Sequence, residues 1–192
     1  TVSKMDSTIN VSYNQVDYGN TLHILVKLNV EGDVELVLNN KTYLAKTSNK
    51  TAEFNISDLD AGEYEFNIAF AGNMIYSQAN VAGSVRISKT TPEVIVTAED
   101  IEYMQSETIT VKVNATGSVE LSLNNISQIE VIDNGVATFC IFGLSAGHYD
   151  ASVKYLGDIN HNVKSSSTSF DVSKATPGIV ILANDIMCGD SG

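Results

Sequence analysis

Tryptophan is absent from the sequence, and cysteine, proline and positive charge are scarce. The 192 residues include two cysteines, two prolines and 11 lysines and arginines, against 23 aspartates and glutamates. The net charge of −12, with no basic cluster, would repel a phosphate backbone, so we expect no nucleic-acid partner. No apolar run approaches the roughly 20 residues that span a bilayer, and the first residues show no signal-peptide pattern. We therefore expect a piece of a longer chain that does not itself span a membrane.

What is present is a repeat. A Val/Ile-Ser dipeptide precedes Lys4, Lys89 and Lys174, and the difference between 4 and 89, and again between 89 and 174, is 85. The same offset aligns Leu59–Tyr64 with Leu144–Tyr149 without a gap. A fixed period indicates an array, and each unit is long enough to close its own apolar core. We predict two domains, residues 1–88 and 89–173, followed by residues 174–192, the linker and first strand of a truncated third repeat.

Alternation of apolar and polar residues dominates both units. Leu22, Ile24 and Val26 share one face of a predicted strand, whose other face carries His23 and Lys27. Turns rich in Gly, Asn and Asp separate about seven such runs in each unit. Strands with one buried face each close most readily as two packed antiparallel sheets. The sequence therefore predicts an all-β fold of two tandem immunoglobulin-like β-sandwiches.

The aligned Leu-x-Ala-Gly-x-Tyr segments have the form of a tyrosine corner. In such a corner a Tyr at the start of the penultimate strand folds its hydroxyl back onto the preceding loop, which gives Tyr64 and Tyr149 a structural role. Two residues later, where an antibody domain carries a cysteine, the chain has Phe66 and Ala151. Antibody-type domains are therefore excluded.

These corners, together with Tyr155–His161 and Val172–Pro177, resemble the tandem prokaryotic Ig-like repeats of large cell-surface adhesin-like proteins, a type common in methanogenic archaea. The match covers both units, and the first unit departs from it at Ser7, Asn73 and Tyr76. The resemblance implies an extracellular stalk or adhesive array at the cell surface. Its implied partners are neighbouring repeats of the same chain and a cell-surface glycan or protein.

The candidate catalytic residues do not recur at aligned positions of the two repeats. Gly189–Gly192 copies the Gly-Asp-Ser-Gly of chymotrypsin-like proteases, but that chemistry needs a His base and an oriented Asp, and the segment aligns with Gly19–Leu22, where a repeat turns into a strand. The histidines do not recur, because His23, His148 and His161 align with Thr108, Glu63 and Tyr76. We predict that the chain is not an enzyme.

Acidic loops offer a candidate cation site. In a sandwich of this kind, Asp17, Asp58 and Asp60 should gather at the end of the first domain that faces Asp133 and Asp158 of the second. Oxygen-rich clusters suit Ca²⁺, whereas acidic loops on a surface protein also serve solubility alone. Both interpretations remain open, and we expect no other cofactor.

Surface chemistry adds three further candidates. Six Asn-x-Ser/Thr acceptors suit a glycosylated surface protein, namely Asn10, Asn40, Asn49, Asn55, Asn114 and Asn125. Cys140 points outward, so a Cys140–Cys188 bridge and two free thiols are both open. Lys27 and Lys112 also point outward, which favours solvated lysines over a crosslink to Asn.

Three functions follow from these patterns. Short linkers with Pro92 and Pro177 favour a semi-rigid rod of end-to-end domains, and hence a non-catalytic stalk that projects a distal binding region. The second function is a module that itself binds a glycan or a host protein through Tyr43, Tyr76 or His161. The third is an assembly subunit that donates its C-terminal strand to a neighbour.

Overall fold

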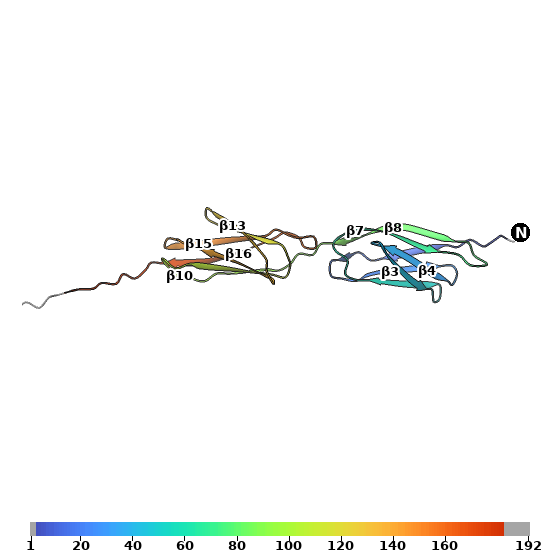
Figure 1. Ribbon diagram of the computed structural model, residues 1–192, viewed down its shortest axis with the longest axis horizontal. Helices are drawn as coiled ribbons and strands as arrows, with labels where there is room; N and C mark the ends of the chain where they lie inside the picture. Colours follow the sequence, from blue (N-terminus) through green and yellow to red (C-terminus); the bar gives the residue numbers. More distant parts are fainter. Residues whose placement is uncertain (1–2, 183–192) are drawn as a thin grey trace, which may run out of the picture.

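The computed structural model describes residues 3–182, which form two β-sandwiches in succession along one long axis (Figure 1). The first domain contains β1 (Ile9–Tyr13), β2 (Val16–Asp17), β3 (Leu22–Leu28), β4 (Asp33–Leu38), β5 (Lys41–Lys46), β6 (Thr51–Ile56), β7 (Gly62–Phe70) and β8 (Ala79–Ser88). The second contains β9 (Val94–Thr97), β10 (Ile101–Glu102), β11 (Glu107–Val113), β12 (Ser118–Leu123), β13 (Ile126–Val131), β14 (Val136–Ile141), β15 (Gly147–Tyr155) and β16 (Lys164–Ser173). The described part of the chain has no helix that could cross a membrane.

The two domains share one topology. In the first, a three-stranded sheet in the order β1-β3-β6 faces a five-stranded sheet in the order β2-β8-β7-β4-β5. In the second, the corresponding orders are β9-β11-β14 and β10-β16-β15-β12-β13. Neighbouring strands are antiparallel except for β2 with β8 and β10 with β16. The predicted tandem immunoglobulin-like fold is confirmed, with eight strands per domain because the first strand of each breaks into two that pair with different sheets.

Each domain folds around its own core. Leu22, Ile24 and Val26 of β3 are at most 1% exposed, and Ile109 and Val111 of β11 are fully buried. The two clusters of buried residues have no member in common. The alternating pattern of the sequence is therefore the pattern of burial, because one face of every long strand points into a sandwich.

One cross-strand pair shows how the repeats exchange side-chain volume. Phe66 of β7 lies opposite Gly83 of β8, and a Cβ atom on Gly83 would lie 2.6 Å from the Phe66 Cζ. At the aligned positions of the second domain, Ala151 lies opposite Thr168. Phe66 with a glycine opposite and Ala151 with a threonine opposite fill similar volumes. Both cores therefore stay packed.

Residues 174–182 form no strand, and the third repeat predicted to begin here stays a prediction because residues 183–192 lie outside the described part of the chain. Ile179 and Ile181 are 84% and 86% exposed. The aligned segment Val94–Thr97 pairs with β11. Residues 3–182 contain no third strand equivalent to β3 and β11 with which residues 174–182 could pair. Cys188 and Gly189–Gly192 lie outside the described residues.

Candidate functional site

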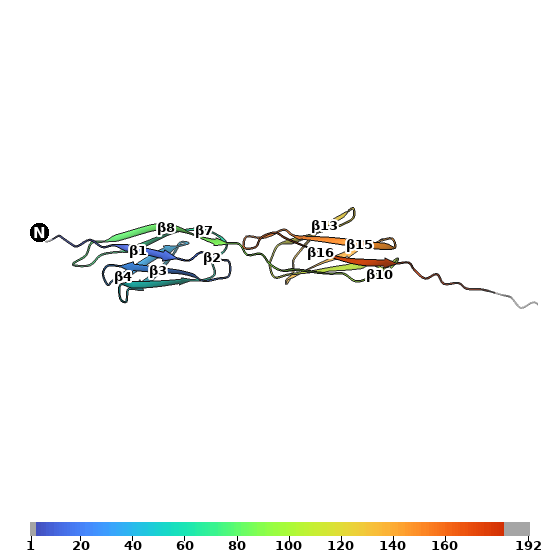
Figure 2. The same ribbon diagram turned by 180° about the vertical axis from the view of Figure 1, so that it is seen from behind.

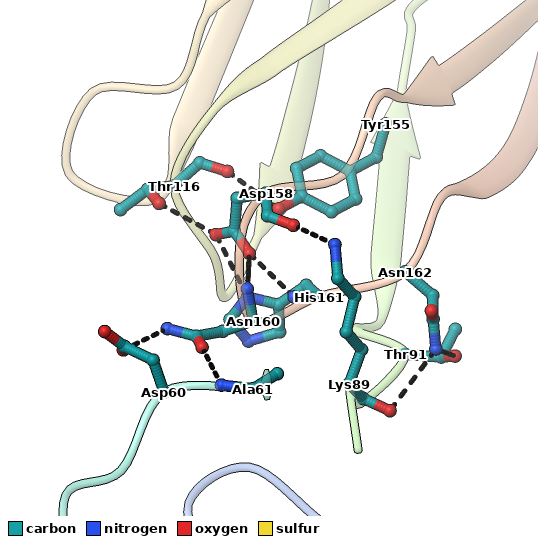
Figure 3. Close-up of polar contacts among 10 residues, drawn as sticks. All are labelled: Asp60, Ala61, Lys89, Thr91, Thr116, Tyr155, Asp158, Asn160, His161 and Asn162. Atoms are coloured by element: carbon teal, nitrogen blue, oxygen red, sulfur yellow. Dashed lines mark hydrogen bonds and ion pairs between the residues drawn. The ribbon is translucent and has the colours of Figure 1, made fainter. Parts of the chain in front are cut away.

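Polar side chains of both domains meet at the junction between them. It is built by the loop of residues 156–163, between β15 and β16, by the linker of residues 89–93, and by the near end of the first domain (Figure 2). We call the loop of residues 156–163 the junction loop. Its contacts with Asp60, Ala61 and Lys89 are drawn in Figure 3.

Asp158 shapes the junction loop. Its carboxylate accepts hydrogen bonds from the Thr116 hydroxyl at 2.8 Å and from the N–H groups of Asn160 and His161 at 2.8 and 2.7 Å, and the His161 Nδ1 lies 2.9 Å away. Burial acts to raise the pKa of Asp158, but these hydrogen bonds outweigh it and hold the pKa well below its ordinary value. A charged Asp158 therefore fixes the backbone that precedes the contact with the first domain.

Tyr155, the residue directly before the junction loop, anchors the start of that loop. Its side chain is fully buried, and its hydroxyl donates to the Thr116 carbonyl oxygen at 2.8 Å. Burial, with the nearby negative charge of Asp158, raises the pKa of Tyr155 to about 12. Tyr155 thus stays protonated and keeps its role as a hydrogen-bond donor.

Asn160 makes the direct bond between the domains. Its Oδ1 accepts the Ala61 N–H at 2.7 Å, and its Nδ2 donates to the Asp60 Oδ1 at 2.9 Å (Figure 3). The residue is 8% exposed, and its own carbonyl oxygen accepts the Thr90 N–H at 3.1 Å. The Asn160 amide therefore bonds to a backbone donor and to a carboxylate of the first domain at once. Two bonds fix the orientation of the loop relative to the first domain as well as its distance.

The first tyrosine corner carries this contact. The Tyr64 hydroxyl donates to the Asp60 carbonyl oxygen at 3.0 Å, and in the second domain the Tyr149 hydroxyl donates to the Ser145 carbonyl oxygen at 2.9 Å. The corner of the first domain is thus bonded both to its own strand β7, through Tyr64, and to the amide of Asn160. Sequence reasoning assigned the corner but missed its second partner.

The linker is clamped along its length. The Asn162 N–H donates to the Thr90 carbonyl oxygen at 2.8 Å, and the Lys89 Nζ donates to the Asp158 carbonyl oxygen at 2.6 Å. The Tyr18 ring meets the His161 ring edge to face, with centroids 5.4 Å apart. Because the linker is fixed to the junction loop, bending between the domains is opposed by the contacts of Asn160 and His161 with the first domain.

The predicted Ca²⁺ ligands do not form one cluster. Asp60 and Asp158 lie on either side of Asn160 and bond to it, whereas Asp58 accepts from the Ser57 hydroxyl and Asp133 from the Asn134 amide. Asp17 is exposed on β2. Within residues 3–182, no group of three or more His, Cys, Asp or Glu side chains is placed to hold a metal ion. Ca²⁺ binding stays a prediction, to be tested by melting temperature with added Ca²⁺ and with a chelator.

The side chains predicted for ligand binding are engaged elsewhere. Tyr43 and Tyr76 are partly buried against the core of the first domain, and His161 belongs to the junction. His148 is exposed, and the hydrogen bond from its ring to the Asp171 carboxylate raises its pKa. A groove of about 990 Å³ lies instead on the outer face of the first five-stranded sheet, where its polar lining includes Asn39, Asn40, Glu63, Glu65 and Asn67.

The surface candidates all lie where modification chemistry can reach them. The six acceptor asparagines are exposed, although Asn55 bonds to the His23 ring at 2.6 Å. Cys140 is exposed on β14, and Lys27 and Lys112 are exposed on β3 and β11. Glycosylation remains a prediction, as does the Cys140–Cys188 bridge, whose second cysteine lies outside the described residues.

The repeat comparison gives little signal for Asn160. The aligned residue of the first domain is Ile75, so an apolar residue gives way to an amide at one loop position. The aligned loops, residues 71–78 and 156–163, share only their glycine, so this change does not stand out from the others in the sequence alone. The sequence predicted that Asp158 of this loop faces the end of the first domain that carries Asp60, but it did not show that Asn160 makes the contact.

No protein-family model matches the sequence, and no curated protein is similar to it in sequence. Solved structures similar to the chain include the fibronectin(III)-like modules of Clostridium thermocellum CbhA, with 13% identity, 92% of this chain and 100% of that chain covered, and a TM-score of 0.40. The titin domains z1z2 in complex with telethonin show 12% identity over 91% and 100%, with a TM-score of 0.48. Likenesses this distant concern the fold alone. From its own strand order and pairing, the chain is a tandem of two immunoglobulin-like β-sandwich domains.

Proposed function

We propose that the chain is a non-catalytic stalk segment of an extracellular, cell-surface adhesin-like repeat protein, and that it projects a distal binding region. The observation that carries the proposal is the Asn160 amide, which bonds to Ala61 and Asp60 across the junction at 2.7 and 2.9 Å. A stalk must hold its domains in line, and a directional bond between a loop and a corner does this better than a bare linker.

The remaining polar groups of the junction support a structural role. Asp158, His161 and Thr116 direct their hydrogen bonds to one another and to the backbone of the junction loop. Groups used in this way hold a shape, whereas a catalytic set needs a nucleophile or base aimed at a space for substrate.

Small-angle X-ray scattering of the chain tests the proposal. We expect the scattering of an extended, two-body particle whose maximum dimension is the same over a range of salt concentrations. Asn160→Ala should broaden the distribution of interatomic distances, because the domains then rotate more freely about the linker. A compact particle, or an extended particle that Asn160→Ala leaves unchanged, would contradict a stalk held by this junction.

A second candidate is a binding module for a glycan or a host protein, and the groove on the first domain is the observation that favours it. Amide and carboxylate groups from Asn39, Glu63 and Glu65 line an open surface, and such groups suit the hydroxyls of a saccharide. The residue of the second domain that aligns with Glu65 is Asp150, which is also acidic but lies outside the groove. Binding on a glycan array that is lost in Glu65→Ala and kept in Asp150→Ala would support this function, and no binding on the array would dismiss it.

A further inference from the structure

Strand β13 lies at the edge of its sheet, and its backbone is open on one side. It is the last strand in the order β10-β16-β15-β12-β13, and its hairpin with β12 stands out from the second sandwich in both views (Figures 1 and 2). The Ile132 N–H donates to the Gly117 carbonyl oxygen at 2.9 Å, and this bond sets the alternation of the ladder. The backbone N–H and C=O groups of Ser127, Ile129 and Val131 therefore point away from β12. Within residues 3–182, no further strand pairs with them.

The equivalent edge of the first domain is protected by charge. Strand β5 aligns with β13 and carries Lys41 and Lys46. Lysines on an edge strand disfavour its pairing with a strand of another molecule. Ile126 and Val131 take their positions in β13, where Val131 is 71% exposed and Ile129 is 59% exposed. Strand β13 has therefore lost the protection that β5 keeps.

The sequence of β13 is complementary to itself. In an antiparallel register centred on Ile129, this residue lies opposite Ile129 of a second copy, and Ser127 lies opposite Val131 of that copy. These are the residues whose backbone groups point outward, so the ladder between the two copies can close with regular hydrogen bonds. On the other face of the strand, the Gln128 amide lies opposite the Glu130 carboxylate. The single charge of β13 thus meets a donor and not a like charge.

We propose that β13 pairs edge to edge with β13 of a second copy of this chain, about a two-fold axis at Ile129, and that the two five-stranded sheets become one. The contact uses the same surface twice, so it closes as a dimer and covers both open edges. Because β13 runs roughly along the long axis (Figure 1), the paired copies point in opposite directions. Stalks anchored on two facing surfaces meet in this way, so the pairing suits adhesion between like surfaces. Only this last step rests on the proposed function.

Sedimentation velocity over a range of chain concentrations tests the pairing, with Cys140 and Cys188 replaced by serine. One pair of strands buries less surface than a standard interface, so we expect dimers at high chain concentration. Ile129→Lys sets two positive charges opposite each other and should raise the dissociation constant roughly tenfold or more. The matched control is Leu44→Lys at the aligned position of β5, which is 75% exposed and should leave the dimer unchanged.

A mixture of two variants tests the register. Ile129→Lys and Ile129→Glu should each be monomeric alone, and an equal mixture should form dimers again, because opposite charges then meet on the two-fold axis. Amide hydrogen exchange, followed by nuclear magnetic resonance, locates the contact. At concentrations that give dimers, the amides of Ser127, Ile129 and Val131 should exchange more slowly, and the Leu44 amide should keep its rate.

The outcomes separate this inference from the stalk function. A chain that stays monomeric at high concentration, or a dimer that Ile129→Lys leaves unchanged, overturns the pairing. A dimer that is lost on truncation after Lys174 also overturns it, because the exposed segment Ile179–Leu182 would then be the strand that β13 accepts. Each of these results leaves the stalk function intact, since scattering at low concentration measures the single chain. A compact single chain overturns the stalk and leaves the pairing of β13 standing if its amides respond as expected.

Discussion

Replacing Asn160 with alanine should uncouple the two domains while leaving each folded. The change removes the acceptor of the Ala61 N–H and the donor to the Asp60 carboxylate, which lie 2.7 and 2.9 Å from the amide. A hydrogen bond contributes about 0.5 to 1.5 kcal/mol net, and Asp60 is exposed, so its charge adds little. We expect the coupling free energy between the domains to fall by about 1 to 3 kcal/mol, or roughly 5- to 150-fold in the equilibrium for opening.

Hydrogen exchange of the Ala61 amide, followed by nuclear magnetic resonance, measures this opening directly. In the parent chain this proton exchanges only when the bond to Asn160 breaks, so its rate should rise by that same factor in Asn160→Ala. Amides in the middle of β3 and β11 should keep their rates because neither core is touched. The matched control is Ile159→Ala, in the same loop but 62% exposed, which should leave the Ala61 rate unchanged.

An unchanged Ala61 rate in Asn160→Ala would refute the reasoning, because it would show that the junction does not protect this amide. A double-mutant cycle with Asp60→Ala separates the two bonds. If both contribute, the effects of the single changes should not add, since each single change already removes the bond between the two side chains.

Further outcomes follow from single contacts. Tyr64→Phe and Tyr149→Phe should each cost about 0.5 to 1.5 kcal/mol in urea unfolding, but only Tyr64→Phe should speed Ala61 exchange, because only that corner holds the junction. Gly83→Thr should cost about 1 to 3 kcal/mol by crowding Phe66, and Phe66→Ala in the same chain should recover part of the loss in urea unfolding; fully additive losses would contradict this pairing. The pKa of Asp158 is lower in the folded than in the unfolded chain, so its contribution is complete above a pH of about 4 and is lost as the pH falls toward the folded value. The melting temperature of the second domain should therefore drop in acid. It should drop less steeply in Asp158→Asn, because an asparagine keeps the hydrogen-bond acceptor but does not titrate, as Asn73 does at the aligned position of the first domain. Equal slopes would count against the role of Asp158.

Much of the fold was accessible from the sequence, because strands with one buried face impose a period of two on the order of residues. The inward positions of β3 and β11, and the corner tyrosines, follow from that period and from the 85-residue offset. The splitting of the first strand into β1 and β2 was missed, because the pattern does not show which sheet a short segment joins. The segment at Ile179, predicted as the first strand of a third repeat, is unpaired within residues 3–182, because these residues contain no third partner strand for it.

The sequence by itself determined the number of domains, the buried face of each strand and the tyrosine corners, since these depend on residues close together in the chain or on a fixed repeat. Only the tertiary structure decided what the acidic and aromatic loop residues do. Asp60 and Asn160 are 100 positions apart, and their contact depends on how one sandwich is set against the next. The sequence predicted that the loops of Asp60 and Asp158 face each other, but no local pattern shows that Asn160 makes the contact or that His161 belongs to the same junction.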